Sequence, residues 1–272
     1  MSAIARTRVT ARVHSFTLGS DTIQTSYGAN AVAVLGKGAV LLVDPFIAPA
    51  HARLLEAALR ELTADPVRFV VLTHHHTDHA LGSGWFAGRG AILIAHEACR
   101  RRMAAEHSGL IAERRKDPVL AGLFDDAVSV LPGAAFEGWL PLLLGGVRVE
   151  IRHAGHGHTP GDAFLFLPEE RVAVCGDLVS NGYHVNYEDA SAAGFRVAMD
   201  ALLALRADTF IPGHGMPGGR EIVEKQIRYQ QEVSTLVRVA ASRDAALRSL
   251  KERFPGYLLE EVLPSAVAAF AA

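Results

Sequence analysis

Residues 67–79 read VRFVVLTHHHTDH and place four histidines and one aspartate directly after an apolar run. An apolar run of this length, followed at once by polar residues, predicts a buried strand at residues 67–72. Alternate side chains of a strand point to the same side, so we expect His74 and His76 to meet at its end and His75 to point away. Imidazole nitrogens are common metal ligands. The stretch therefore predicts a metal site at the exit of a core strand.

The same stretch could supply a second metal position. We expect the chain to turn into a helix after His76, which would place Asp78 and His79 in the first helical turn, beside the first position. The alternative is a surface histidine cluster without a chemical role. Such tracts bind metals weakly and rarely interrupt a core strand, which favours a built site.

The pattern His-x-His-x-Asp-His resembles that of the metallo-β-lactamase-fold hydrolase superfamily. Four further segments resemble motifs of this family and follow in the family's order: LLVD at 41–44, GHTPGD at 157–162, CGD at 175–177 and PGHG at 212–215. The resemblance covers about residues 44–214, most of the chain. It implies an α/β (α+β) fold, namely a four-layered αββα sandwich of the metallo-β-lactamase type.

The resemblance also implies a dinuclear metal centre with seven ligands. The implied ligands are His74, His76 and His158 for one metal, Asp78, His79 and His214 for the other, and Asp177 bridging the two. The family's first motif further implies that Asp44 supports the centre without touching a metal.

Two histidine assignments depend on the resemblance. Composition alone does not choose among His153, His156 and His158, which lie close together in the sequence. The match to the family motif GHTPGD selects His158. His96 follows a predicted strand and could also touch the site, although the implied ligand set is complete without it.

Histidine and carboxylate ligands suit zinc, but they also suit iron or manganese, so we expect two zinc ions with iron or manganese as alternatives. Two adjacent cations would share a water and lower its pKa, which supplies hydroxide without a separate protein base. The bridging hydroxide would attack a carbonyl carbon, with Asp78 and Asp177 as the catalytic carboxylates. We therefore predict a dinuclear metal-dependent hydrolase of a small carbonyl substrate, such as a thioester, lactone, amide or β-lactam-like compound.

Asp177 bears on the subclass of hydrolase. Antibiotic-degrading members of the family carry a cysteine at the corresponding metal position, whereas the cysteine here is Cys175, two residues earlier. The aspartate resembles thioesterases, lactonases and related hydrolases, and we find no glutathione-binding pattern of the glyoxalase II type and no RNA-processing domain. Two other functions stay open. One is a mononuclear-iron oxidoreductase of the persulfide dioxygenase type, with iron on His74, His158 and Asp177, and the other is a non-enzymatic protein that keeps metal for structure.

Composition limits the partners. The chain has 272 residues, half of them hydrophobic, and we expect residues 1–272 to form a single domain. A formal net charge of −2 argues against nucleic-acid binding, and we expect the two dense basic groups, at 100–102 and 114–116, on solvated helix faces. With two cysteines, no evident secretory signal and no membrane-spanning segment, the sequence predicts a small-molecule substrate and a cytoplasmic location, without membrane partners.

The rest of the pattern predicts alternating strands and helices. We expect strands at 12–18, 31–43 with a turn at 36–38, 91–95, 147–151, 163–167, 171–175 and 209–211, and helices at 49–63, 189–205 and 220–251. Residues 97–138 are expected to form a helical insertion, which could be a substrate lid or could cover one sheet edge. The apolar tail at 258–272 could pack on the core or on a second subunit, so a homo-oligomer is compatible with the sequence.

The loop after Asp177 offers side chains that could face a substrate. Tyr183 or His184 could donate a hydrogen bond to a developing oxyanion. Tyr27 and Asn30 could line the mouth of the site in a similar way. Ordinary loop roles are the alternative for all four residues.

Overall fold

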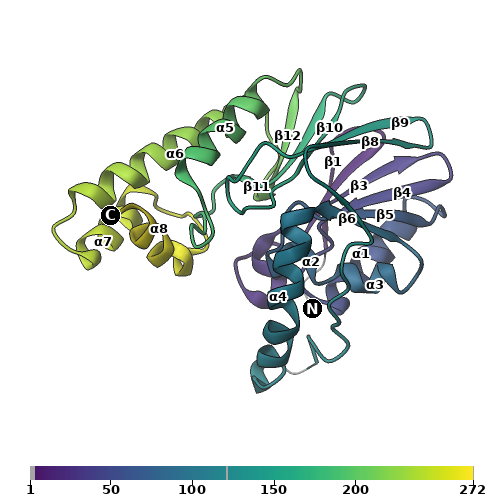
Figure 1. The fold of residues 1–272 in the computed structure, drawn as a ribbon, viewed down its shortest axis with the longest axis horizontal. Coiled ribbons are helices and arrows are strands. Elements are labelled where there is room, and N and C mark those ends of the chain that lie inside the picture. The colour runs from purple at the N-terminus through teal and green to yellow at the C-terminus, as the bar shows by residue number, and fades with distance from the viewer. Residues whose placement is uncertain (1–3, 121, 272) are drawn as a thin grey trace.

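Two β-sheets lie face to face at the centre of the molecule (Figure 1). The structure is a computed structural model and describes residues 4–120 and 122–271. The first sheet contains, in this order, β1 (Ala5–Arg8), β2 (Val13–Thr17), β3 (Asn30–Gly36), β4 (Ala39–Val43), β5 (Val67–Val71), β6 (Ile92–His96) and β7 (Ala134–Phe136). The second has the order β12-β11-β10-β9-β8 and contains β8 (Trp139–Leu144), β9 (Val147–Arg152), β10 (Phe164–Leu167), β11 (Val172–Ser180) and β12 (Thr209–His214).

Helices cover the outer face of each sheet. Buried side chains of α1, α3 and α4 pack on the first sheet, and those of α5 and α6 pack on the second. The predicted four-layered αββα sandwich is therefore confirmed. The helices are α1 (Pro49–Arg60), α2 (Thr77–Ala80), α3 (Ser83–Ala87), α4 (Glu97–Arg114), α5 (Ala192–Leu203), α6 (Arg220–Val239), α7 (Arg243–Arg253) and α8 (Leu263–Phe270), with 3-10 turns η1 (Ile23–Gly28), η2 (Pro118–Leu120) and η3 (Glu260–Val262).

Alternate side chains of a strand point to opposite faces of its sheet. One set packs in the core between the two sheets, and the other packs in the core between the sheet and its helices. In β3, Val32 and Val34 point into the space between the sheets, whereas Ala31 and Ala33 face the helices of the first layer. A strand that is buried on both faces has no polar side, which explains why β3 is apolar after Asn30.

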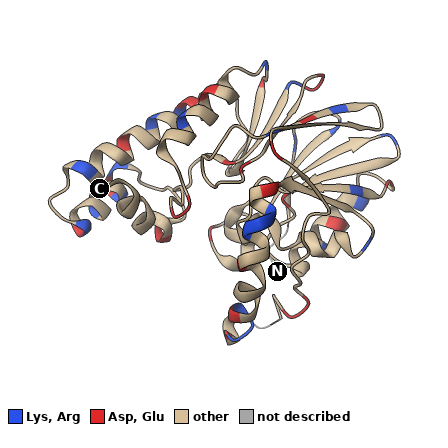
Figure 2. Ribbon diagram, viewed as in Figure 1, with Lys and Arg blue, Asp and Glu red and all other residues tan. Residues whose placement is uncertain are grey.

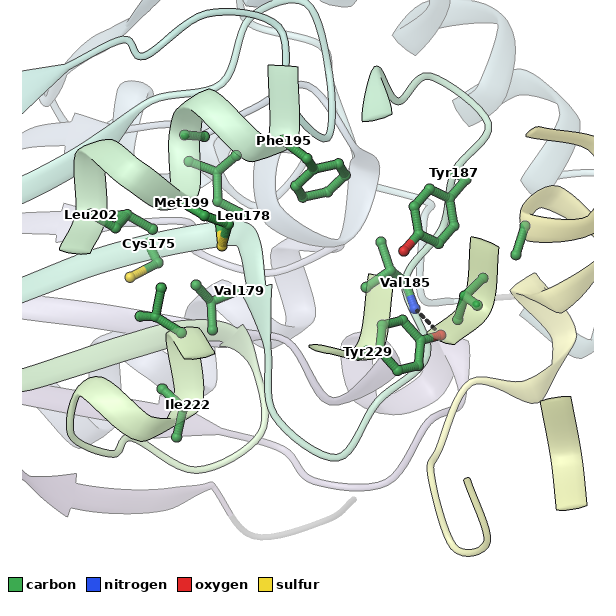
Figure 3. Close-up of a cluster of buried hydrophobic side chains, with 14 of the residues drawn as sticks. Cys175, Leu178, Val179, Val185, Tyr187, Phe195, Met199, Leu202, Ile222 and Tyr229 are labelled. Atoms are coloured by element: carbon green, nitrogen blue, oxygen red, sulfur yellow. Dashed lines mark hydrogen bonds between the residues drawn. The ribbon is translucent and has the colours of Figure 1, made fainter. Parts of the chain in front are cut away.

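The outer core of the second sheet extends beyond the sheet itself. Figure 3 shows Met199 and Leu202 of α5 beside Cys175 and Val179 of β11. The same cluster continues through Tyr229 of α6, whose hydroxyl accepts a hydrogen bond of 3.4 Å from the backbone N–H of Val185, to α7 and α8. The apolar tail thus packs on the core of its own chain, as one of the two sequence alternatives proposed.

The strand ends that carry the motifs meet at one edge of the sandwich. Strands β4, β5 and β6 run parallel, as do β11 and β12. The carboxyl ends of parallel strands are the usual position of ligand sites in α/β proteins. Hydrogen bonds join the two sheets there, because the N–H of Ala163 donates to the carbonyl of Thr73 at 2.7 Å and the Asn30 amide donates to the carbonyls of Pro212 and Gly215.

Two predictions of secondary structure need correction. The expected closing helix at 220–251 is two helices, α6 and α7, because the side chain of Ser242 accepts a hydrogen bond from the N–H of Ala245 and starts a new helix. The segment 97–138 is helical over α4 and η2 but also contains β7, which pairs with β6. The short strand β7 has only three residues, too few to show a period. The short strand β1 and the strand β8 were not predicted.

The charged residues are of mixed sign over the whole molecule. Figure 2 shows Lys and Arg interspersed with Asp and Glu along α4 and along the helices of the second outer layer. Among the residues that the structure describes, no helix combines the length and the apolar character needed to cross a membrane.

The packing of α5 on the second sheet predicts a large difference between two positions of this helix. Leu202 is fully buried, whereas Val197 is 57% exposed. Leu202→Ala should lower the free energy of unfolding by about 2–5 kcal/mol, because it leaves a cavity, and Val197→Ala should change it by less than about 0.5 kcal/mol. Urea unfolding at one fixed metal concentration measures both. Equal losses in the two variants would contradict this packing.

Candidate metal centre

The first group of converging side chains comes from three separate motifs. Nδ1 of His76 and Nε2 of His158 lie 2.9 Å apart, and the Asp177 carboxylate lies 3.5 Å from Nε2 of His158 and 3.9 Å from Nε2 of His74. All four side chains offer a ligand atom within 4.8 Å of one another. The loop after β5 therefore meets the loop before β10 and strand β11 at one point.

A second group lies on the other side of Asp177. Nε2 of His79 and Nε2 of His214 are 3.2 Å apart, and the carboxylate of Asp78 lies 3.3–3.4 Å from both. The Asp177 carboxylate is 3.2 Å from His79 and 3.4 Å from His214. The structure thus brings together all seven residues of the implied ligand set, with Asp177 between the two groups.

The hydrogen bonds around the histidines leave the nitrogens that face the cluster free for a cation. The Thr73 hydroxyl donates to Asp44 at 2.6 Å, so Nδ1–H of His74 must donate to the Thr73 oxygen at 2.9 Å. Nε2 of His74 is then a bare acceptor, and it is buried with no hydrogen-bond partner. An unshared electron pair on a buried nitrogen beside a carboxylate fits a metal ligand.

Three other histidines of the cluster are oriented in the same way. His79 directs Nδ1 to Asp44 at 3.1 Å, His214 directs Nδ1 to the carbonyl of Tyr27 at 3.1 Å, and His76 directs Nε2 to Asp189 at 3.2 Å. Each oxygen acceptor keeps a proton on that ring nitrogen and turns the other nitrogen into the cluster. The donor set therefore fits two divalent cations.

Burial and charge separate the histidines into two kinds. Burial lowers the pKa of His74 well below its usual value and lowers the pKa of His158 to about 3. Burial also acts to lower the pKa values of His79 and His214, but Asp177 and the second carboxylate beside them outweigh it. The pKa of His79 consequently lies well above its usual value and that of His214 is about 9. A cation that binds at these two imidazoles must displace their protons.

Asp44 holds the first two motifs in place, as the resemblance implied. Its carboxylate accepts hydrogen bonds from the Thr73 N–H at 2.8 Å, from the Thr73 hydroxyl and from the ring of His79. The backbone of Asp44 is left-handed, with φ of 51°, a conformation that aspartate tolerates better than most residues. Strain of this kind persists only where the surroundings fix it, and it commonly marks functional sites.

Asp162 holds the loop of His158 in place, as Asp44 does for the first two motifs, and this role was not predicted from the sequence. Its carboxylate accepts hydrogen bonds from the N–H groups of Gly157, His158 and Thr159 and from the Thr159 hydroxyl. Burial raises the pKa of Asp162 to about 7 despite these bonds. Its position in the motif GHTPGD was the sequence signal for this role. The reason for that position is the turn that brings three backbone N–H groups to its carboxylate.

Two glycines permit the close approach of Asp177 to its partners. Asp177 lies beyond the expected strand at 171–175 but within the longer observed strand β11, where the pairing with β12 shifts register around Gly176. A Cβ on Gly176, whose φ is 53°, would lie 2.5 Å from Thr73 Oγ1, and one on Gly213 would lie 1.8 Å from Asp177 Oδ1. Only glycine fits at these two positions.

The residues that were predicted to face a substrate have different surroundings in the structure. His184 and Tyr27 line the cavity described below, whereas the Tyr183 hydroxyl donates to the carbonyl of Ser20. Asn30 joins the two sheets. Nε2 of His96 contacts the Glu137 carbonyl at 2.9 Å, and His96 belongs to none of the ligand groups among the described residues.

His75 belongs to neither of the two ligand groups and instead clusters with His76 and Asp189. Its Nε2 lies 3.3 Å from Asp189, which also accepts a hydrogen bond of 2.7 Å from Arg102 of α4. Hydrogen bonds from His75, from His76 and from Arg102 hold the pKa of Asp189 well below its usual range. This network could not be predicted from the sequence, because Asp189 lies 87 residues from Arg102 and 113 residues from His76 and shares no local pattern with them.

A cavity of about 710 Å³ opens beside the cluster. One wall is α4, through residues such as Glu106 and Leu110, and the opposite wall is the C-terminal segment with Leu259 and Val262. Asp177 and two members of the second ligand group, Asp78 and His214, also line the cavity. A small molecule could therefore reach the proposed metal positions from this side.

Residues 25–214 match the family model described as the Metallo-beta-lactamase superfamily. The chain belongs to this superfamily. The solved structure of the metallo-beta-lactamase FIM-1 from Pseudomonas aeruginosa, in the mono-zinc form, has the same fold with a TM-score of 0.67 at 21% identity, and the match covers 83% of this chain and 93% of that one.

Two curated members of the superfamily illustrate its range. A hydroxyacylglutathione hydrolase from Acidiphilium cryptum is 31% identical over 216 residues, which cover 79% of this chain and 73% of that protein. A linear primary-alkylsulfatase from a Pseudomonas species is 23% identical over 266 residues, which cover 85% of this chain and 49% of that protein. The chain thus spans about half the length of the alkylsulfatase.

The approach of Gly213 to Asp177 predicts a specific loss of metal. Gly213→Ala would push a methyl group against the Asp177 carboxylate, so it should lower metal affinity by at least about 10-fold, as loss of ligand orientation does. Gly138→Ala is the matched control, because a Cβ there meets nothing within 4 Å. Competition with a chromophoric chelator measures both affinities. Wild-type affinity in Gly213→Ala would contradict the role given to Asp177.

Proposed function

We propose that this chain is a dinuclear metal-dependent hydrolase that acts on small carbonyl substrates such as thioesters, lactones or amides, with zinc as its metal. The observation that carries the proposal is the position of Asp177, whose carboxylate lies within 3.5 Å of histidines from both ligand groups. A carboxylate that serves a single ion needs no second set of histidines. The hydroxyacylglutathione hydrolase among the similar proteins supports hydrolysis of a carbonyl compound.

Each residue of the cluster has a task in this proposal. His74, His76 and His158 would hold one zinc ion, and Asp78, His79 and His214 would hold the other, with Asp177 shared. When bound, a pair of zinc ions supplies an activated water and polarises the substrate carbonyl. Asp44 and Asp189 fix the rings of His79 and His76, so the ligands need not reorganise during turnover.

Zinc is favoured by the donor set and by one structural relative. Five imidazoles and two carboxylates are borderline ligands that suit zinc, while iron and manganese remain chemically compatible. The mono-zinc form of FIM-1 shows that the same fold accommodates zinc. The mononuclear-iron alternative would use His74, His158 and Asp177 and would leave the second group without a cation.

A pair of neighbouring histidines tests the ligand assignment. His158→Ala should lower the metal content per chain and reduce hydrolysis by at least about 100-fold, because it removes a ligand and not merely a residue that orients one. His156→Ala should retain both, since His156 is exposed and its Nε2 contacts only the Asp189 carbonyl at 2.6 Å. Metal analysis by mass spectrometry and a panel of esters, thioesters and lactones provide the two measurements.

The same panel separates the proposed function from its alternative. Hydrolysis by the zinc-loaded enzyme without oxygen, abolished by chelation and restored by zinc, is the expected result. Oxygen uptake with a persulfide substrate by an enzyme that holds one iron per chain would instead support the dioxygenase. Two metals per chain with no turnover of any substrate would leave only a structural metal site and would contradict the proposal.

A further inference from the structure

We propose that the substrates of this site carry an anionic group, a carboxylate or a similar oxyanion, and that Arg114 of α4 binds it. This inference rests on the proposed function, because it concerns the molecule that the metal cluster would hydrolyse. It follows from the position of Arg114 in the cavity and from its lack of an ion pair with a carboxylate. It also follows from the partners that the other charged side chains of the cavity already have.

Arg114 lies close to the second ligand group. It lines the same cavity as Asp78, Asp177 and His214, and its Nη2 donates a hydrogen bond of 2.8 Å to the hydroxyl of Thr77. Thr77 directly precedes Asp78 in the chain. A group bound by this guanidinium would thus lie next to the reacting part of the substrate.

Arg114 forms no direct ion pair in the part of the chain that the structure describes, although the charge of Asp78 acts on it from a longer distance. Among the described residues, no carboxylate oxygen lies within 4.0 Å of it, whereas Arg102, which lines the same cavity, pairs with both Glu106 and Asp189. Nη1 of Arg114 is buried and makes no hydrogen bond, so an anion in the cavity would meet the N–H groups of Nε and Nη2 instead. Buried charges are normally paired, so an unpaired guanidinium in a cavity indicates an external anion.

The surroundings hold the Arg114 side chain in this place. Its guanidinium lies over the ring of Phe124, with 5.1 Å between the guanidinium carbon and the ring centroid. The neighbouring Arg115 fixes the loop that carries Phe124 by donating to the backbone carbonyls of Phe124, Asp125 and Ala127. The expectation that residues 114–116 form a solvated face is therefore wrong for Arg114, which is half-buried.

The other charges of the cavity cannot take this role. Asp78 and Asp177 would belong to the metals, and Arg102 is neutralised by its two carboxylates. Glu188 and Glu261 are exposed at the rim. Arg114 is thus the one arginine among the residues described as lining the cavity that makes no ion pair with a carboxylate. A guanidinium presents parallel N–H groups that match both oxygens of a carboxylate.

Arg114 could instead serve only to attach α4 to the metal-binding loop through Thr77. The two roles predict different kinetics. A structural attachment would be lost equally in Thr77→Val, and its loss would affect neutral and anionic substrates alike. An anion-binding role would survive in Thr77→Val, and its loss would affect anionic substrates alone.

The decisive experiment compares substrates that differ only in charge. We would use 4-nitrophenyl hydrogen adipate against its methyl ester, and 5-oxotetrahydrofuran-2-carboxylate against its methyl ester, with the zinc-loaded enzyme. Arg114→Met should raise KM for the anionic member of each pair about 10- to 100-fold, as expected for a lost charge-assisted hydrogen bond, and change the neutral member by less than about 3-fold. Arg101→Met is the control, since Arg101 is an exposed arginine of the same helix, paired with Glu97.

A binding measurement keeps this inference separate from the proposed function. Calorimetry with adipate and with adipamide needs no turnover, and Arg114→Met should weaken the binding of adipate alone about 10- to 100-fold. The wild type could hydrolyse no substrate while Arg114→Met still lowers the affinity for adipate. In that case the proposed function fails and anion binding stands. The inference is overturned if adipate binds equally to wild type and Arg114→Met, or if the substitution lowers the affinities for adipate and adipamide equally. Should Arg114→Met not fold, Arg114→Lys replaces it and must retain a preference for adipate over adipamide.

Discussion

The structure depends on one electrostatic constraint, the meeting of five imidazoles and two carboxylates around Asp177 in a largely buried site. Nitrogen lone pairs only 2.9–3.2 Å apart, as between His76 and His158 or His79 and His214, need partial or full positive charge between them, from an N–H hydrogen or from a cation. Protons can supply part of it, since the carboxylates raise the pKa values of His79 and His214. Two divalent cations would supply all of it and would also satisfy the bare Nε2 of His74.

The same constraint explains features that lie away from the ligands. Both sheets must end their parallel strands at one edge, and their backbones must approach so closely that Gly176 and Gly213 can carry no side chain. Asp44 and Asp162 each collect several N–H or O–H donors, which fixes the loops on either side of Asp177. Rigid loops are required because metal affinity and catalysis both depend on ligand positions that do not have to be reorganised.

Local features of the site and the fold could be predicted from the sequence, and long-range features could not. The spacing of His74, His76 and His79 follows from the strand period and one helical turn, and the apolar strands follow from burial on both faces. The contact of Asp189 with His76 spans 113 residues and leaves no periodic signal. The break between α6 and α7 did have a signal in Ser242, but the helical period on both sides of it concealed the cap.

Arg114 shows why a polar helix is hard to interpret from sequence alone. Helix α4 packs Met103 and Ile111 on the core, lines the cavity with Arg102, Leu110 and Arg114, and exposes the remainder, so its charged residues lie both on a solvated face and on a functional one. A pattern of polar positions cannot separate these two faces, whereas the missing ion pair can. The facing wall belongs to residues 259–262, beyond the segment 25–214 that matches the family model. The superfamily segment thus contains all seven implied ligands, and under the proposed function the segment outside it would contribute to substrate choice.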